Sequence, residues 1–534
     1  MKTWRIGSNW GGGTDLSDIF KKHDIAFAGS EIKHLLSQVS PGDIVAVTSG
    51  RTIIAVCKVN EIINLSSIDK TYVTEFDDVD ALKFEKLYFA NDLKLDFGIY
   101  DGQGKQFHQT GDDHYDQLIK NNYHRAKSLF MNKNIKNILL ETKNIILTGA
   151  PGTGKTYLAK QLAQQMIFGD IKDQLSDDEQ KQFDRQCAFV QFHPNYDYTD
   201  FVEGLRPVQD DDGNIGFERR DGIFKEFCKK ALKAQNPTIG SCFDRLITEI
   251  SNSPNYSVKL KSGTQSTTLS VVDNSIKWKE QNSDKIADHS VTKNNIQTLY
   301  KTYNTLEKLN EVKNIDTEFR DIIGSQNTTY YWAILNKLLE MQNEMQENYI
   351  FIIDEINRSE ISKVLGELFF SIDPGYRGVE GKVKTQYQNL IKEDEEDEFY
   401  DGFYVPENVY IIGTMNDIDR SVESMDFAFR RRFAFKDIKA TDRIVMLYDV
   451  QTGLGSYADK AIEKMNNLNK KIEEIDNLSA AYHIGPAYFL KLKNYNGDFG
   501  QLWDNHLEGL LREYLRGMQN VDEKLKDLKD AYDK

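Results

Sequence analysis

The fold of this chain is decided by the stretch Ile145-Ile146-Leu147-Thr148-Gly149-Ala150-Pro151-Gly152-Thr153-Gly154-Lys155-Thr156. An apolar strand runs into the pattern G-x-x-x-x-G-K-T, and a helical segment follows it. Glycines let successive backbone amides face a phosphate, the lysine adds a positive charge, and the threonine hydroxyl can ligate Mg²⁺. The pattern predicts a nucleotide-binding P-loop made of Gly149, Ala150, Pro151, Gly152, Thr153, Gly154, Lys155 and Thr156.

A second buried strand, at 349–353, ends in the adjacent carboxylates Asp354 and Glu355. Behind a P-loop, this arrangement is typical of a Walker B strand. We expect Asp354 to hold Mg²⁺, together with Thr156, and Glu355 to polarise the attacking water. Two acids after an apolar strand also occur by chance, and the P-loop upstream is what favours the catalytic interpretation.

A third apolar strand, at 409–414, is followed by Met415 and Asn416. An amide at the tip of a neighbouring strand can contact both the γ-phosphate and the water beside Glu355, which is the sensor 1 role in AAA+ proteins. Further along, Arg430, Arg431 and Arg432 stand at a predicted helix end, where they are candidate arginine fingers for a neighbouring subunit. The alternative is a basic helix terminus stabilised by the helix dipole.

Composition restricts the remaining possibilities. The chain has 534 residues, enough for three to four domains, and a formal net charge of -16, which argues against coating nucleic acid through global charge. The four cysteines lack metal-binding spacing and indicate a reducing compartment. No apolar run approaches membrane-spanning length and the N-terminus lacks a signal-peptide pattern, so we expect a cytoplasmic protein without membrane contact.

The sequence divides into four predicted regions. Residues 1–112 contain short β-branched runs with glycine turns, including a hairpin signal at Ser49-Gly50, and 113–142 is a helical linker. Residues 143–440 form the large α/β subdomain, with a polar insertion at about 240–346, and 441–534 is a helical lid. An acidic run at 393–398 is expected to be a solvated loop.

The segment Met415-Asn416-Asp417-Ile418-Asp419-Arg420-Ser421 resembles the M-N-x-x-D-R-S signature of McrB-type AAA+ proteins, the motor subunits of modification-dependent restriction systems. Further resemblances lie at 190–207, 221–225, 354–358, 482–489 and 510–515. The resemblance implies an α/β AAA+ P-loop core, a parallel sheet flanked by helices, with a helical C-terminal lid. It also implies a homo-oligomeric ring, expected to be a hexamer, in which Asn416, Asp419 and Arg420 position or activate the hydrolytic water.

McrB-type subunits hydrolyse a nucleotide but do not cut DNA, so the resemblance implies a partner McrC-like nuclease subunit and no nuclease site in this chain. The nucleotide is left open between GTP and ATP. Family members use GTP and most AAA+ relatives use ATP, and the absence of an N-K-x-D motif decides nothing because AAA+ proteins do not recognise guanine that way.

The N-terminal region looks like a PUA-like barrel of the EVE or YTH kind, on the stretches 4–11 and 41–47. That class flips a modified base into an aromatic pocket. Trp4, Trp10 and Phe27 are the candidate stacking residues, and modified (methylated) DNA is the expected ligand. Tryptophans in a small β domain are, however, more often core residues, and acidic side chains outnumber basic ones in the first 110 residues.

Two other functions stay open at this point. One is a MoxR- or dynein-like AAA+ ATPase that remodels a protein partner, which would show no dependence on DNA. The other is a nucleotide-gated binding module without turnover, against which the joint presence of Glu355, Asn416 and the arginines argues.

Overall fold

The computed structural model describes residues 2–10, 14–27, 33–64, 80–101, 107–172, 174–209, 214–235, 239–253, 256–261, 266–279, 287, 289–344, 347–391, 397–418, 427–449 and 453–534. The internal contacts of the chain divide it into two compact units. The first comprises Met1–Met166, Ile352–Arg358 and Ile412–Lys534, and the second comprises Ile167–Phe351 and Ser359–Ile411.

The N-terminal region of the first unit is built on a six-stranded sheet in the order β4-β7-β6-β5-β1-β8. The strands are β1 (Thr3–Gly7), β4 (Ile25–Phe27), β5 (Ile44–Ser49), β6 (Thr52–Asn64), β7 (Asp80–Phe89) and β8 (Phe107–Gln109). The short strands β2 (Asn9–Trp10) and β3 (Thr14–Asp15) pair with each other, and α1 (Ser17–His23), α2 (Lys33–Leu36) and α3 (Ala90–Leu93) complete the region. The predicted hairpin is present: Ser49 pairs with Thr52, and Gly50 takes a φ of 60° at the turn.

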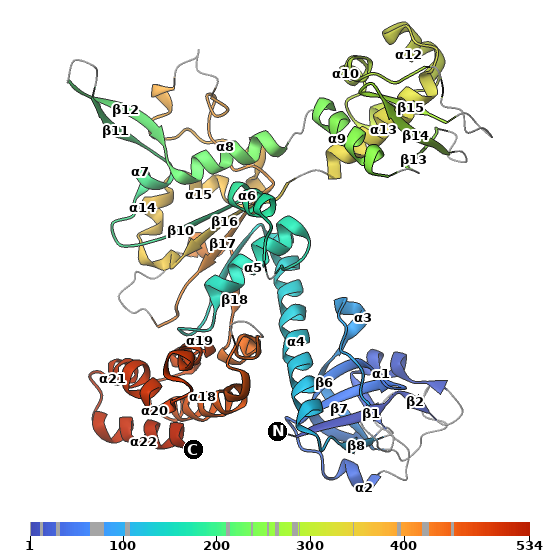
Figure 1. Ribbon diagram of the computed structural model, residues 1–534. Helices are drawn as coiled ribbons and strands as arrows, with labels where there is room; N and C mark the ends of the chain where they lie inside the picture. The colour runs from blue at the N-terminus through green and yellow to red at the C-terminus, as the bar shows by residue number, and fades with distance from the viewer. Residues whose placement is uncertain are drawn as a thin grey trace. The chain divides into compact units, whose positions relative to one another are not determined.

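A single 30-residue helix, α4 (Asp113–Thr142), follows this sheet (Figure 1). It begins at an N-cap, because the Asp112 side chain accepts a hydrogen bond from the His114 amide. It ends at Lys143 in the left-handed conformation, one residue before the P-loop strand. The helix is therefore continuous between the N-terminal sheet and the nucleotide-binding core.

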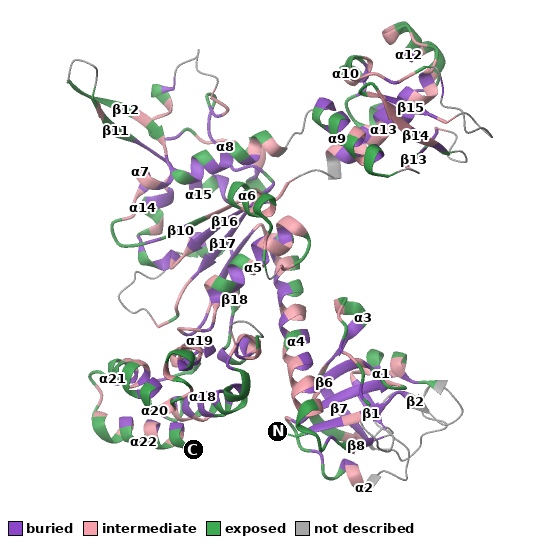
Figure 2. Cartoon of the chain, in the orientation of Figure 1, coloured by how far each residue is buried: buried purple, intermediate pink, exposed green. Residues whose placement is uncertain are grey.

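The core is a five-stranded parallel sheet flanked by helices, in the order β10-β16-β17-β9-β18. The strands are β9 (Asn144–Thr148), β10 (Cys187–Gln191), β16 (Tyr349–Asp354), β17 (Val409–Thr414) and β18 (Ala434–Asp437). Every residue of β17 is buried, and only the last residue of β16 is partly exposed, which explains their continuous apolar sequences (Figure 2). The P-loop helix α5 (Lys155–Phe168) follows β9 directly.

The second unit carries a two-stranded ribbon, β11 (Glu203–Gln209) and β12 (Ile215–Asp221), followed by α8 (Ile223–Gln235). A buried ionic network holds the base of this ribbon. The network consists of Glu203, Arg219, Asp221, Lys225, Lys229 and Asp397. Lys225 Nζ lies 2.6 Å from Glu203 Oε2, and both side chains are fully buried.

Asp397 corrects one expectation from the sequence. The acidic run at 393–398 was expected to be solvated, but the Asp397 side chain is 6% exposed and accepts hydrogen bonds from Lys229 at 2.7 Å and Arg219 at 3.1 Å. Residues 393–396 lie outside the described residues. Asp397 can be buried because Arg219 of β12 and Lys229 of α8 compensate its charge. The local run of acidic residues does not reveal these distant partners.

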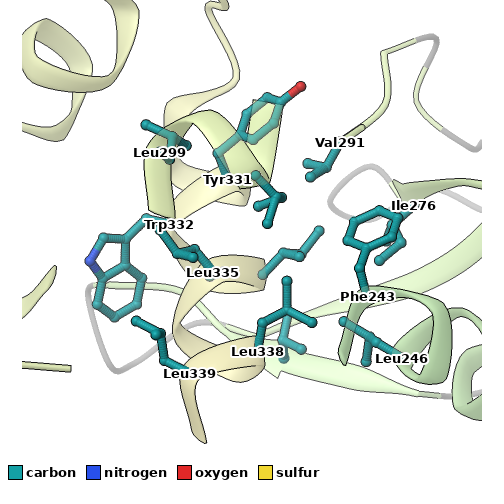
Figure 3. Packing of buried hydrophobic residues seen from close by; sticks show 14 of the residues in the cluster. Phe243, Leu246, Ile276, Val291, Leu299, Tyr331, Trp332, Leu335, Leu338 and Leu339 are labelled. Carbon is teal, nitrogen blue, oxygen red and sulfur yellow. The ribbon is translucent and has the colours of Figure 1, made fainter. Parts of the chain in front are cut away.

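The insertion forms a small body with its own apolar core (Figure 3). Its elements are α9 (Ile239–Asn252), β13 (Ser257–Lys259), β14 (Ser266–Val272), β15 (Ser275–Trp278), α10 (Lys293–Tyr300), α11 (Leu306–Glu311), α12 (Ile315–Ile323) and α13 (Thr328–Glu344). Leu335 and Leu338 of α13 pack toward Phe243 of α9 and Ile276 of β15. The core explains why a polar sequence still folds here.

The C-terminal lid is helical, as the sequence predicted. Its helices are α17 (Val445–Tyr448), α18 (Ala458–Glu473), α19 (Pro486–Phe489), α20 (Phe499–Leu502), α21 (Glu508–Tyr514) and α22 (Val521–Asp533). Their apolar faces form one buried cluster around Met465, Leu468 and Trp503. Across the described part of the chain, no helix combines the length and the apolar character needed to cross a membrane.

The ionic network generates a prediction about Glu203. Burial by itself raises the pKa of this carboxyl, but the charge and hydrogen bond of Lys225, together with hydrogen bonds from Thr385 and the Tyr387 amide, outweigh it, so the pKa lies below its ordinary value. A lowered pKa stabilises the folded state above the pKa of the unfolded chain, and this contribution is lost as pH falls through the folded pKa. We expect Glu203→Gln to lower the free energy of opening the ribbon by about 3–5 kcal/mol at neutral pH, since it leaves two buried cations short of charge. Hydrogen exchange of β11 and β12, followed by mass spectrometry, measures this.

Glu218→Gln is the matched control on the same ribbon, because Glu218 is 57% exposed and pairs with the exposed Arg220. Exchange that rises equally in both variants would contradict the role given to the network. The difference between native chain and Glu203→Gln should also shrink as the pH is lowered into the acid range.

Candidate functional site

The carboxyl ends of β9, β16 and β17 lie side by side, and the residues predicted to bind and hydrolyse the nucleotide lie at or follow these ends. Strand β17 lies between β9 and β16, and the Met415 amide donates to the Leu147 carbonyl at 3.0 Å. Parallel strands carry their carboxyl ends at one edge of the sheet, which is where ligands bind in such folds. The P-loop, Asp354, Glu355 and Asn416 consequently lie together, although some 260 residues separate the first from the last.

Lys155 is buried, and oxygens surround its ammonium group. Its Nζ donates to the carbonyls of Gly149 at 3.0 Å and Ala150 at 2.9 Å, and to Asn416 Oδ1 at 2.9 Å. These three acceptors carry no formal charge. A phosphate is the kind of ligand that would supply negative charge at this position.

Thr156 and Asp354 converge as the sequence predicted for an Mg²⁺ site. Thr156 Oγ1 donates to Asp354 Oδ1 at 2.6 Å, and Thr414 Oγ1 donates to the same oxygen at 2.7 Å. Hydroxyl and carboxylate oxygens are the hard ligands that Mg²⁺ accepts, and it keeps several waters and phosphate oxygens as its other ligands. The donor set present therefore fits Mg²⁺ held by Thr156 and Asp354.

Glu355 and Asn416 form a direct pair. Asn416 Nδ2 donates to Glu355 Oε1 at 2.6 Å, so the amide of Asn416 bridges Lys155 and Glu355. Glu355 has a φ of 51°, a left-handed conformation that costs free energy for any residue other than glycine. Its amide donates to Thr414 Oγ1 at 3.2 Å, and Arg358 lies 3.5 Å from its other carboxylate oxygen. Strained backbone held by several contacts is a common feature of reactive sites.

The lid contributes a contact that the sequence analysis did not identify. The Gly485 amide donates to the Pro151 carbonyl at 3.0 Å, and the Ala487 amide donates to the Gly152 carbonyl at 3.0 Å. A Cβ on Gly485 would lie 2.1 Å from the Gly152 carbonyl carbon, and one on Gly152 would lie 2.5 Å from the Tyr488 ring. Gly485 therefore requires glycine because backbone meets backbone there, and Gly152 requires it because its φ is 74° and the Tyr488 ring fills the space of a side chain.

Thr414 and Asp417 were also missed as site residues. Thr414 is the last residue of β17, and its hydroxyl connects Asp354 with the Glu355 amide. Burial raises the pKa of Asp417, the nearby Asp437 adds to this, and Lys155 acts in the opposite direction. The sequence offered two signals for them, since Thr414 ends an apolar strand and Asp417 follows the sensor residue Asn416. The groups that surround them follow from the strand order and not from the sequence pattern.

The three candidate arginine fingers differ in exposure. Arg432 is buried, and its guanidinium donates to the Ala428 carbonyl of the same segment. Arg430 and Arg431 are exposed, and Arg430 lies 5.1 Å from the Phe435 ring centroid. Of the three candidate arginine fingers, Arg430 and Arg431 are therefore the ones exposed enough to contact another molecule.

The candidate base-stacking residues need a correction. Trp4 is fully buried, stacked on Phe107 with ring centroids 5.3 Å apart, and its Nε1 donates to Asp43 at 3.0 Å. Phe27 is 2% exposed and packs edge-on against Phe20. Neither ring has a face available to a base, because both belong to the core of the sheet.

Three other predicted site residues cannot be placed. Asp419 and Arg420 lie outside the described residues, and so does the side chain of Trp10.

Comparison with known proteins gives two family matches. Residues 245–433 match the AAA domain of the dynein-related subfamily, and residues 460–522 match the alpha-helical lid domain of McrB. The second match falls on the helical region whose Gly485–Ala487 segment contacts the P-loop. The chain thus combines an AAA core with a McrB-type lid, as its sequence predicted.

Two curated relatives are components of restriction enzymes. The chain is 29% identical over 351 residues to the type IV methyl-directed restriction enzyme EcoKMcrB subunit of Escherichia coli (strain K12). This covers 65% of the chain and 47% of the relative, so the chain spans about half of that protein's length. It is also 29% identical over 103 residues to the type II restriction enzyme BsuMI component YdiS of Bacillus subtilis (strain 168), which is 19% of the chain and 30% of the relative.

The contact between lid and P-loop generates a prediction about Gly485. We expect Gly485→Ala to weaken nucleotide binding at least about tenfold, because the added methyl group must push the lid away from Gly152 or distort the P-loop. Titration with a fluorescent nucleotide measures the affinity. Gly509→Ala is the control in the same lid, since a Cβ there meets no atom within 4 Å. Equal affinity in the two variants would show that the contact does not shape the site.

Proposed function

We propose that this chain, a McrB-type AAA+ protein, hydrolyses a nucleoside triphosphate at the P-loop with Mg²⁺. One observation carries the proposal: Asn416 bridges Lys155 and Glu355, beside the Thr156–Asp354 pair. A group that binds phosphate and a group that can accept a proton from water are thereby held at a fixed separation. A module that only bound nucleotide would not need this arrangement.

Each residue has a role that follows from its contacts. The P-loop amides and Lys155 bind the β- and γ-phosphates, and Glu355 accepts a proton from the attacking water while Asn416 orients its carboxylate. Mg²⁺, when bound by Thr156 and Asp354, neutralises charge that develops on the phosphate oxygens. Thr414 fixes the direction of Asp354 and the backbone of Glu355 through its one hydroxyl.

The ring and the arginine fingers belong to the same proposal. Arg430 and Arg431 are exposed and follow the sensor strand in the chain. We expect them to reach a second copy of the chain, as arginine fingers do in AAA+ rings. A guanidinium supplied by a neighbour stabilises charge in the transition state of phosphoryl transfer. Turnover would then depend on assembly, with a hexamer as the expected ring.

The biological context comes from the relatives. One is named as a methyl-directed restriction enzyme subunit and the other as a restriction enzyme component. We therefore include in the proposal that the N-terminal region binds modified DNA and that hydrolysis drives a McrC-like nuclease subunit. GTP and ATP both remain candidate substrates.

A second candidate is remodelling of a protein partner by an ATPase. It is favoured by the match to the dynein-related AAA subfamily, which is not specific to restriction systems. Hydrolysis measured with and without methylated duplex DNA separates the two: stimulation by methylated DNA supports the restriction motor. Turnover indifferent to DNA and faster with ATP supports remodelling.

The proposal predicts the behaviour of a Glu355→Gln variant. It keeps the hydrogen bond to Asn416 but cannot accept a proton, so we expect nucleotide binding to persist while turnover falls at least about a hundredfold. Phosphate release with Mg²⁺ and either GTP or ATP measures turnover, and the mass of the assembly is measured in parallel. Lys155→Ala should instead lose binding itself.

Normal turnover in Glu355→Gln would exclude Glu355 as the base. Exposed Glu360 provides the control, since Glu360→Gln removes one negative charge nearby and has no contact with Asn416.

A further inference from the structure

Helix α4 is packed against the N-terminal sheet along one stripe. Ile119, Tyr123 and Ala126 are buried in a cluster with residues of β5 and β6, and their spacing of three to four residues places them on one face. Asn122 Nδ2 donates to the Phe97 carbonyl at 2.7 Å. The first half of α4 is therefore part of the N-terminal body rather than a free linker.

A neighbouring stripe of the same helix contacts the lid. Lys120 Nζ lies 2.8 Å from Asp459 Oδ2 of α18, and the His124 ring stacks on Tyr448 of α17 at 5.2 Å between centroids. Tyr448 in turn donates its hydroxyl proton to Asp459. Burial lowers the pKa of His124 to about 3, so a neutral ring makes this contact at neutral pH.

Arg443 joins this helix to the P-loop helix. It lies in the single turn Ala440–Arg443 that leads into the lid, and it is 1% exposed. Its Nη1 donates to Ser128 Oγ at 3.0 Å and Asn132 Oδ1 at 3.3 Å of α4, and its Nη2 donates to Gln161 Oε1 of α5 at 2.5 Å. The guanidinium also lies 5.9 Å from the Tyr157 ring centroid.

These hydrogen-bond partners are neutral, which makes the arginine costly. Burial lowers the pKa of Arg443 to about 10, with Tyr157 and Asp442 acting in the opposite direction, so the side chain stays charged at neutral pH. A buried charge bonded only to neutral groups stabilises a fold less than an apolar side chain of the same volume. The rigid fork of a guanidinium does, however, fix the relative positions of the groups it binds.

We propose that Arg443 is a positioning residue that couples the N-terminal domain, through α4, to the P-loop helix and the lid. A ligand that shifts α4 at the N-terminal sheet would thereby shift α5, which begins at Lys155, and change the turnover rate. This coupling rests on the proposed function, and it adds a route by which occupancy of one domain controls hydrolysis in another.

The test compares the full chain with Arg443→Met, which keeps an unbranched side chain as far as the position of Nε and removes the fork. Arg125→Met is the matched control, since Arg125 is an exposed arginine on the same helix. We expect Arg443→Met to lower kcat at least about tenfold with KM within about twofold of native and an unchanged or raised Tm, because α5 is misplaced while the fold is kept. Arg125→Met should have the same kcat, KM and Tm as the native chain.

A second measurement reports the coupling itself. Hydrogen exchange is followed with and without Mg²⁺ and a non-hydrolysable ATP or GTP analogue. In the native chain we expect nucleotide to change exchange in α4 and in β5 and β6, and in Arg443→Met we expect that change to be lost while it persists in α5. Arg443→Lys should restore little of the nucleotide-dependent change in exchange, because an ammonium group lacks the planar fork of a guanidinium.

The outcomes separate the two proposals. A native chain that binds the analogue but does not hydrolyse ATP or GTP overturns the proposed function, and the exchange measurement still decides the coupling. Equal nucleotide-dependent exchange in native chain and Arg443→Met overturns the coupling whatever the turnover. If Arg443→Met lowers Tm in parallel with kcat, Arg443 has only a structural role, and this result also overturns the coupling.

Discussion

The position of strand β17 between β9 and β16 is the constraint on which the nucleotide site depends. It places Asn416 between the P-loop lysine and the Walker B glutamate, at hydrogen-bond distance from both. Because β17 separates β9 from β16, the side chain that follows its end is the one that contacts both Lys155 and Glu355. The same order lets Thr414 contact Asp354, so one strand supplies both the bridge and its support.

The P-loop is held from a second direction by the lid. Backbone amides of Gly485 and Ala487 bond to P-loop carbonyls, so the loop's own acceptors are used by the lid while its amides remain available to a phosphate. Helix α4 and Arg443 extend this connection to the N-terminal sheet. The first unit is consequently continuous from the N-terminal domain to the phosphate-binding residues, through contacts that are mostly buried.

Tertiary packing, rather than a local sequence pattern, determines the environment of the residues that were misjudged from the sequence. Trp4 and Phe27 were expected to stack on a base because they are aromatic and lie in a region that resembles a PUA-like barrel, yet Phe107 and Phe20 pack against them. Asp397 stands in an acidic run but neutralises Arg219 and Lys229. Gly485 lies in the stretch 482–489, which resembles the McrB-type family, and its close backbone approach to Gly152 explains why a glycine stands there.

The sequence by itself determined the P-loop, the strand that ends in Asp354 and Glu355, and the strand that is followed by Asn416. It also determined the helical lid and the β-rich N-terminal region. These follow from local patterns, because apolar runs, glycine spacing and helical periodicity specify backbone conformation within a few residues. The tertiary structure alone decided that Asn416 bridges Lys155 and Glu355, that Arg432 is buried while Arg430 and Arg431 are exposed, and that Arg443 joins three elements. Such contacts join residues as many as 315 positions apart, and burial and hydrogen bonding at that range depend on strand order and packing, which no local pattern encodes.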